Sequence, residues 1–270
     1  MDRLSQSLLH LFTRGADLGG ATIARPEWQA EFSARGVGGT CAAYEPLADR
    51  WQVCDDARAR ERFLPAATFD IALALIGIEE GAIADENEVF RWDGRPKPRP
   101  ERERDQTLAT GMRHEAAWMF QEVARRIGRV RMREWLDRLA YGNRGLGGGI
   151  EHFWLQGGLR VSAREQVAFL HRLAEGRLPA TQRAQRLVRE ALVVEKTREY
   201  TLYARSGSNP RAKDPLAWRI GWIERKGRPT ACFALNLTAP AGARCADASA
   251  IARSILAHAR WLPDGEPSRR

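Results

Sequence analysis

Apolar residues recur at helical spacing through the middle of the chain. From Ala66 to Glu80 nearly every position is apolar, which predicts a helix buried on all sides and ended by Gly81. The motif Ser162-Ala-Arg-Glu165 is a capping box, so a further helix is predicted to begin there and to run through Ala174. Four more helices are predicted at about 117–127, 130–139, 181–193 and 248–260.

Runs of β-branched and aromatic residues predict strands near both ends of the chain. A hairpin is predicted from Gly39–Tyr44 and Trp51–Cys54. If Tyr44 pairs with Trp51, Cys41 faces Cys54, so these two thiols either form a cross-strand disulfide or stay reduced neighbours. Three further strands are predicted at Tyr200–Arg205, Trp218–Glu224 and Thr230–Leu237.

Strands at both ends with helices between them predict an α+β fold. The expected architecture is an antiparallel sheet formed by both chain ends and flanked by helices, plus an all-helical subdomain. We expect an N-terminal extension over 1–24, one domain over 25–262 and a tail over 263–270. Within the domain, the sheet subdomain is expected to take about 25–65 and 195–262, and the helical subdomain about 66–194.

Composition narrows the function classes. The net charge is +9, but only four of the 43 basic residues are lysines and the arginines form no single cluster, so no nucleic-acid partner is expected. The longest apolar run, 71–78, is far shorter than the roughly 20 residues of a membrane span. The stretch Leu8–Phe12 is too short for a signal-peptide core, so we expect either a cytoplasmic protein or one whose leader has been removed. The sequence has no metal-ligand spacing, so no metal or cofactor is expected, and it leaves the oligomeric state open.

A series of short motifs follows a characteristic order between Arg25 and Leu237. They are Pro26-Glu-Trp-Gln, Gly36-Val-Gly-Gly-Thr40, Arg60–Phe63, Pro65-Ala-Ala-Thr-Phe69, Phe90-Arg-Trp-Asp-Gly94, Tyr141-Gly-Asn143, Phe153-Trp-Leu155, Gly158-Leu-Arg-Val-Ser162, Gly221-Trp-Ile-Glu224 and Phe233-Ala-Leu-Asn236. Together they resemble the class D (OXA-type) serine β-lactamases, relatives of the penicillin-binding proteins. The resemblance implies the serine β-lactamase fold, with a cleft between the sheet and the helical subdomain.

The catalytic positions that the resemblance implies are degenerate. The family's first motif, Ser-x-x-Lys, supplies the serine nucleophile and a carboxylated lysine as general base, but here it is Ala67-Thr-Phe-Asp70. The second motif, Ser-x-Val, is replaced by Glu115-Ala-Ala, and the third, Lys-Thr/Ser-Gly, by Arg205-Ser-Gly. At Ala67, Asp70, Glu115 and Arg205 no catalytic residue of the family is intact.

Other positions of the family's cleft are kept. The resemblance implies a binding cleft formed by Tyr141, Asn143, Trp154, Arg205, Ser206 and Gly207. Family members also use a downstream arginine on the substrate carboxylate. A match without gaps places Ala248 there, and Arg244 fits only after a shift.

These departures predict a pseudoenzyme that binds a β-lactam, a cell-wall peptide or another anion. The alternatives are an active β-lactam hydrolase, if Ala67 and Asp70 are engineered or another mechanism operates, and a purely structural or regulatory protein. For Asp70 we expect an ion pair with Arg205 at the start of a helix. The alternative is a two-carboxylate acid/base or metal site with Glu115.

Overall fold

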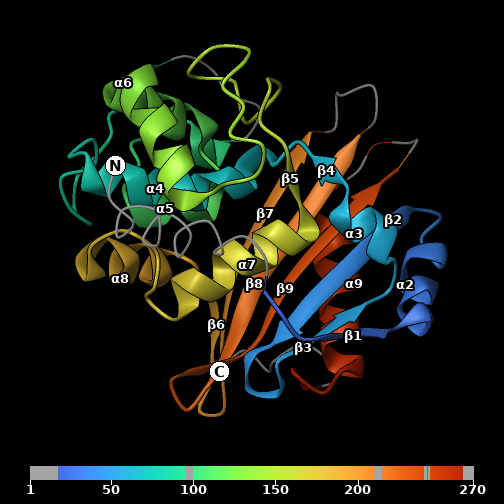
Figure 1. Ribbon diagram of the computed structural model, residues 1–270. Coiled ribbons are helices and arrows are strands. Elements are labelled where there is room, and N and C mark those ends of the chain that lie inside the picture. Colours follow the sequence, from blue (N-terminus) through green and yellow to red (C-terminus); the bar gives the residue numbers. More distant parts are fainter. Residues whose placement is uncertain (1–17, 95–99, 210–214, 240–241, 243, 264–270) are drawn as a thin grey trace, which may run out of the picture.

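A seven-stranded sheet with helices on both faces forms one half of the molecule, and a group of helices forms the other (Figure 1). The computed structural model describes residues 18–94, 100–209, 215–239, 242 and 244–263. The first 17 residues, including Leu8–Phe12, and residues 264–270 of the expected tail lie outside this part. Helix α7 (Ala163–Ala174) covers one face of the sheet, and α9 (Cys245–His258) covers the other. The expected α+β class and the flanking helices are confirmed.

The sheet is built from both ends of the chain, as predicted. Its strand order is β1-β3-β2-β9-β8-β7-β6. The predicted hairpin is β2 and β3, and its register does pair Tyr44 with Trp51. Cys54 N donates to Cys41 O at 3.3 Å, and both cysteines are free thiols. The strands of this sheet are β1 (Ala21–Ala24), β2 (Gly38–Glu45), β3 (Arg50–Val53), β6 (Val193–Lys196), β7 (Thr201–Asn209), β8 (Leu216–Arg225) and β9 (Arg228–Thr238). A separate two-stranded sheet is formed by β4 (Arg62–Phe63) and β5 (Val161–Ser162).

One edge of the sheet differs from the expectation. Ala21–Ala24, placed in an N-terminal extension by the sequence, form β1, and this strand pairs parallel to β3 rather than antiparallel. Its side chains are mostly exposed, so no alternation of apolar and polar residues marks the strand in the sequence. The strand is held by its main-chain pairing with β3, which is a tertiary contact.

The predicted buried helix begins with a tight turn. A 3₁₀ turn, η4 (Ala66–Phe69), leads into α4 (Asp70–Glu79), and the residues from Asp70 to Ile78 are all buried. The two helices predicted at 117–127 and 130–139 form one element, α6 (Ala117–Leu139), with a non-helical Gly128 at φ 76°. The capping box at Ser162 is present. The remaining helices of four residues or more are α2 (Gln29–Ser33), α3 (Asp56–Arg60), α5 (Leu108–His114) and α8 (Gln182–Ala191).

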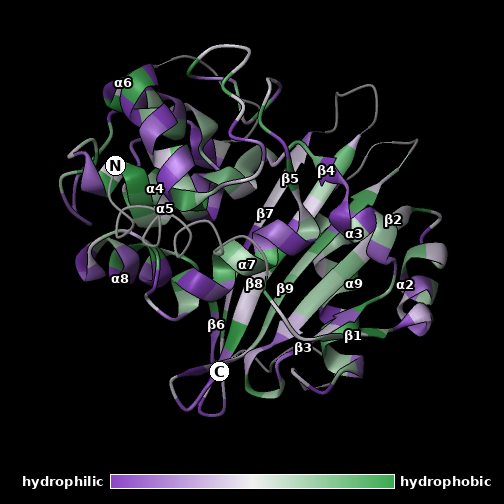
Figure 2. Cartoon of the chain, viewed as in Figure 1, coloured by the Kyte–Doolittle hydropathy of each residue, from purple (hydrophilic) through white to green (hydrophobic). Residues whose placement is uncertain are grey.

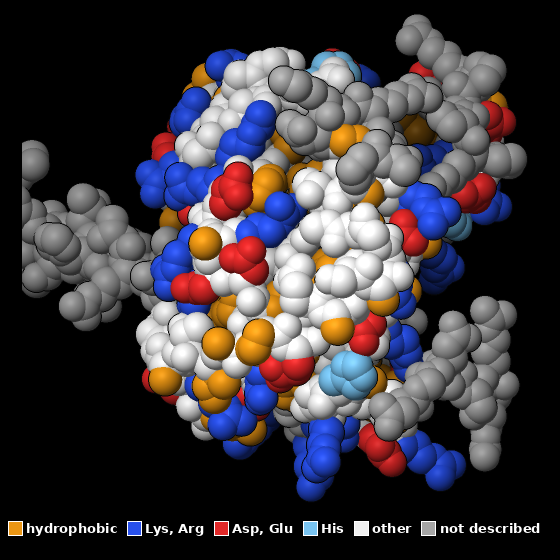
Figure 3. All heavy atoms as spheres, turned by 90° about the vertical axis from the view of Figure 1, so that its right-hand side faces the viewer, with side chains coloured by type: hydrophobic (Ala, Val, Ile, Leu, Met, Phe, Trp, Pro, Cys, Tyr) orange, Lys and Arg blue, Asp and Glu red, His pale blue; other side chains and the backbone are white. Residues whose placement is uncertain are grey.

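Successive side chains of the central strands point to opposite faces of the sheet, so the hydrophobic core has one part on each face. In β8, Trp218, Ile220 and Trp222 pack toward the helical half, whereas Ala217 and Ile223 pack with α9. Strands β2, β8 and β9 are accordingly green to white in Figure 2, whereas α8 is mainly purple. The face shown in Figure 3 carries basic side chains interspersed with acidic ones rather than in one patch. Within the described residues, no helix has the length and apolar character needed to cross a membrane.

Candidate functional site

The first turn of the buried helix holds Ala67 and Asp70, the two positions that the motif order assigns to the family's first motif. The backbone of Ala66 is left-handed, with φ 49°, and its N–H donates to the carbonyl of Trp154 at 3.0 Å. This arrangement leaves the Ala67 methyl group half-buried at the beginning of the turn. The neighbouring Thr68 is buried, and its hydroxyl donates to Pro65 O at 2.7 Å and accepts from Gln166 Nε2 at 2.8 Å. Thr68 is therefore engaged in packing the turn.

Asp70 and Arg205 form a buried ion pair, as expected. Arg205 Nη2 donates to Asp70 Oδ2, and both side chains are at most 3% exposed. The same guanidinium donates from Nε to Ala67 O at 3.1 Å and from Nη1 to Met112 O. Arg205 thereby ties β7 to the first turn of α4 and to the last turn of α5.

Burial dominates the electrostatics of Asp70. Desolvation raises the pKa of this carboxyl to about 6, against the opposing effect of the Arg205 charge and its hydrogen bond. The charge of Glu115 raises the pKa further, and the indole N–H of Trp154 lowers it. Among the described residues, neither Asp70 Oδ1 nor Trp154 Nε1 has a hydrogen-bond partner within normal distance. The carboxylate of Asp70 is thus hydrogen-bonded through Oδ2 to Arg205, whereas its Oδ1 has no hydrogen-bond partner among the described residues.

Glu115 lies apart from this pair. It takes the left-handed C-cap position of α5 with φ 54°, and its Oε2 accepts from Arg102 Nη2 at 2.8 Å. Each of the two carboxylates therefore has its own arginine. In the described part of the chain, no three His, Cys, Asp or Glu side chains come together in a way that could hold a metal ion. This arrangement does not support the two-carboxylate alternative.

The cleft residues that match the family's motifs have different structural roles. Tyr141 is buried, and its hydroxyl donates to Gln166 Oε1 at 3.1 Å. Trp154 is fully buried, with its ring 5.9 Å from that of Phe69. Asn143 is exposed and holds a loop together, because its Oδ1 accepts from Arg160 N at 2.8 Å. Thus Trp154 flanks Asp70, Tyr141 packs behind the helix turn, and Asn143 braces a neighbouring loop.

Strand β7 passes very close to the first turn of the helix. A Cβ atom added at Gly207 would lie 2.8 Å from the backbone nitrogens of both Ala67 and Thr68, so only glycine fits there. Ser206 is buried and points to the opposite face of the sheet, where its Oγ lies 3.4 Å from Ser249 Oγ on α9. The structure therefore brings Ala67, Asp70, Arg205 and Gly207 together, and it separates Ser206 from them.

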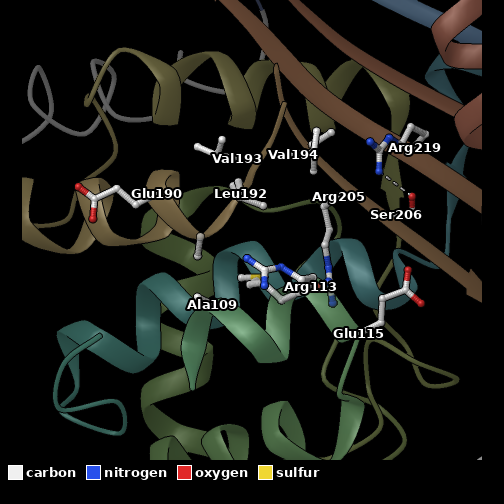
Figure 4. Close-up of a pocket in the computed structure, with 13 residues that line it drawn as sticks. Ala109, Arg113, Glu115, Glu190, Leu192, Val193, Val194, Arg205, Ser206 and Arg219 are labelled. Carbon is white, nitrogen blue, oxygen red and sulfur yellow. Dashed lines mark hydrogen bonds between the residues drawn. The ribbon is translucent and has the colours of Figure 1, made fainter. Parts of the chain in front are cut away.

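A pocket of about 420 Å³ adjoins the motif positions, and two of its arginines lie outside the motifs. Glu115, Arg205 and Ser206 line it together with Arg113 and Arg219 (Figure 4). Arg219 lies within the predicted strand Trp218–Glu224, and its position between the apolar residues Trp218 and Ile220 is the signal in the sequence that marks it.

Neither candidate for the missing carboxylate-binding arginine reaches this pocket. Arg244 is exposed and pairs with Asp247 through two hydrogen bonds of 2.8 and 2.9 Å. Ala248 is fully buried on α9.

Comparisons with known proteins agree with the fold and the motif order. Residues 44–257 match the penicillin binding protein transpeptidase domain. The chain is 38% identical to β-lactamase OXA-5 of Pseudomonas aeruginosa over 233 residues, 85% of this chain and 87% of that protein. It is 40% identical to β-lactamase OXA-10 of Pseudomonas aeruginosa over 212 residues, 77% and 80% of the two chains. The crystal structure of FUS-1 (OXA-85), a class D β-lactamase from Fusobacterium nucleatum subsp. polymorphum, superposes with a TM-score of 0.84 at 29% identity, covering 89% of this chain and 100% of that chain.

Proposed function

Since this chain belongs to the class D β-lactamase family, we propose that it is a member that binds ligands of the family type without hydrolysing β-lactams. In this proposal Ala67, Asp70, Glu115 and Arg205 mark a catalytic centre that no longer forms an acyl-enzyme. The fold and the neighbouring cleft are kept for binding a β-lactam-like or peptidoglycan-like ligand.

The observation that carries the proposal is the buried Asp70–Arg205 pair next to the methyl group of Ala67. Acyl transfer needs a nucleophilic oxygen and a base that removes its proton. Ala67 has no such oxygen. Asp70 sits at the base position, but its Oδ2 accepts from Arg205, and Thr68 is locked by two hydrogen bonds inside the turn. Because nucleophile and base act as a unit, their joint loss removes the family's chemistry.

The test is the intact mass of the protein after incubation with excess benzylpenicillin, together with turnover of a chromogenic cephalosporin. We expect an unchanged mass and no turnover. A thermal-unfolding shift with benzylpenicillin or a muropeptide, in the same buffer, tests the binding half of the proposal. A covalent adduct on the native chain would overturn the proposal, and it would favour the alternative of an active β-lactam hydrolase with an unrecognised nucleophile. A shift with neither ligand would refute binding.

A restored variant serves as the positive control. Ala67→Ser and Asp70→Lys alone place a lysine beside the buried Arg205, and two neighbouring buried cations repel each other. We therefore expect the combination Ala67→Ser, Asp70→Lys, Glu115→Ser and Arg205→Lys to form an adduct with benzylpenicillin more readily than the double variant. Ala67→Ser alone should form none, because Asp70 stays paired with Arg205.

A further inference from the structure

The pocket beside the motif positions lies where strand β6 stops covering β7. Backbone pairing between these two strands ends near Ala204, whose N–H donates to Leu192 O at 2.9 Å. Beyond this point the C-terminal end of α5 and the junction of α8 with β6 wall a pocket of about 420 Å³ (Figure 4). This size is within the range of small-molecule sites.

Some of the arginines that line the pocket have an ion-pair partner and others do not. Arg205 is neutralised by Asp70, and the two acidic residues of the lining are paired elsewhere, Glu115 with Arg102 and Glu190 with Arg186. No carboxylate of the described residues lies within ion-pair distance of Arg113 or Arg219. Two positive charges at the pocket are therefore left without an ion-pair partner among the described residues, although the charge of Glu115 acts on Arg219 from a longer distance.

Arg219 is the more constrained of these two cations. It is half-buried on β8 and pairs in the strand register with Ser206 of β7. Its Nη1 donates to Ser206 Oγ at 3.0 Å, which fixes the guanidinium at the pocket (Figure 4). Burial lowers the pKa of Arg219 to about 10, so it is still protonated at neutral pH. A desolvated cation of this kind gains most from an anionic ligand.

Ser206 adds a donor beside this charge. Its oxygen accepts from Arg219, so the hydroxyl hydrogen can be directed either to Ser249 Oγ, 3.4 Å away, or to a ligand. The opposite wall is apolar. Val193 and Val194 are 40% and 50% exposed, and Leu192, Ala109 and Met112 complete that wall.

We propose that this pocket binds an organic carboxylate, with Arg219 and Arg113 holding the carboxylate, Ser206 donating a hydrogen bond to it, and Val193 and Val194 contacting its apolar body. The inference rests on the proposed function only in that the region of the motifs binds a ligand. It assigns that ligand's charge to two arginines outside the motif positions.

Ligand-observed NMR titrations with phenylacetate and its neutral amide, phenylacetamide, test the proposal. We expect phenylacetate to bind more tightly than phenylacetamide and than acetate. Arg219→Gln should weaken phenylacetate binding by about tenfold or more, as expected for loss of a charge-assisted contact. Arg113→Gln should weaken it less, because Arg113 is exposed. Arg228→Gln is the matched control, since Arg228 is an exposed arginine at the β8–β9 turn, outside the pocket lining.

Equal binding of phenylacetate and phenylacetamide, or unchanged binding by Arg219→Gln, would overturn the proposal. Equal binding of acetate and phenylacetate would overturn the role of the apolar wall. If Arg219→Gln fails to fold, Arg219→Lys keeps the charge, and it should retain more affinity than Arg219→Met.

The two proposals fail separately. A penicillin adduct refutes the claim that no acyl-enzyme forms and leaves the titration unaffected. A titration without charge dependence refutes the carboxylate pocket and leaves the mass measurement unaffected.

Discussion

Removal of Asp70 and removal of Arg205 should have different effects on the free energy of unfolding. Asp70→Ala leaves a buried guanidinium that cannot lose its proton, and breaking a buried ion pair typically costs about 3–5 kcal/mol. Arg205 would keep two carbonyl acceptors, Ala67 O and Met112 O. We therefore expect a loss near the lower end, about 3 kcal/mol. The free energy of unfolding of this variant should not vary with pH through Asp70, because the titrating group is gone.

Arg205→Met instead leaves a carboxyl that can be protonated. Burial already raises the pKa of Asp70 to about 6, and removal of Arg205 takes away the strongest opposing effect. Asp70 should then be neutral in the folded state at pH 7 and ionised in the unfolded state. The folded state binds the extra proton, so the free energy of unfolding falls as pH rises, by about 1.4 kcal/mol per pH unit.

The native protein should behave differently above pH 6. With a folded pKa of about 6 against an ordinary value of 3.8, the contribution of Asp70 to stability is present below pH 4 and is lost as pH rises through 6. Above about pH 7 the carboxyl is ionised in both states, and its contribution no longer changes.

Urea unfolding followed by tryptophan fluorescence at pH 6, 7 and 8 measures these differences. Arg205→Met should lose stability with rising pH relative to the native protein and to Asp70→Ala. The double variant Asp70→Ala/Arg205→Met should lose less than the sum of the two single losses, by about 1–3 kcal/mol. The exposed Arg186–Glu190 pair is the control, with an expected coupling below about 1 kcal/mol. A pH-independent Arg205→Met, or additive losses, would refute a coupled buried pair.

Three further predictions follow from local geometry. Gly207→Ala should destabilise the protein by about 1–3 kcal/mol in urea unfolding, because its Cβ would lie 2.8 Å from two backbone nitrogens; an unchanged midpoint would contradict the close approach of β7. Ser162→Ala should cost about 1 kcal/mol by the same assay, because Ser162 Oγ caps the Glu165 N–H at 3.2 Å, and Ser162→Asp should restore most of it. Iodoacetamide should label Cys41 and Cys232 only after unfolding, since both are fully buried and burial raises the pKa of each thiol, whereas the half-buried Cys54 and Cys245 should react first, as read by peptide mass mapping.

Much of the fold could be predicted from short-range patterns. The run of apolar residues from Ala66 to Glu80 gave a buried helix, and the capping box at Ser162 gave the beginning of another. The hairpin was predicted from its two strands, and the register that the sequence left as a condition, with Tyr44 opposite Trp51, is the one that the structure has. β1 escaped prediction because its residues are exposed and it exists only by pairing with β3.

The candidate site could likewise be predicted only in part. The motif order alone indicated that Ala67 and Asp70 replace a nucleophile and a base, and the family geometry predicted the pairing of Asp70 with Arg205. The role of Arg219 could not be predicted in this way, because it depends on strand register. Only the pairing of β7 with β8 brings Ser206 opposite Arg219, at the edge that β6 leaves uncovered.

The sequence by itself determined which atoms are present at the motif positions, a methyl group at Ala67 and a carboxyl group at Asp70. The tertiary structure decided which charges are compensated. It buries Asp70 against Arg205 and pairs Glu115 with Arg102, while Arg113 and Arg219 line a pocket with no carboxylate of the described residues within ion-pair distance of either. The physical reason is that electrostatic compensation depends on distance and burial, and residues more than 100 positions apart in the chain acquire both only when the sheet assembles.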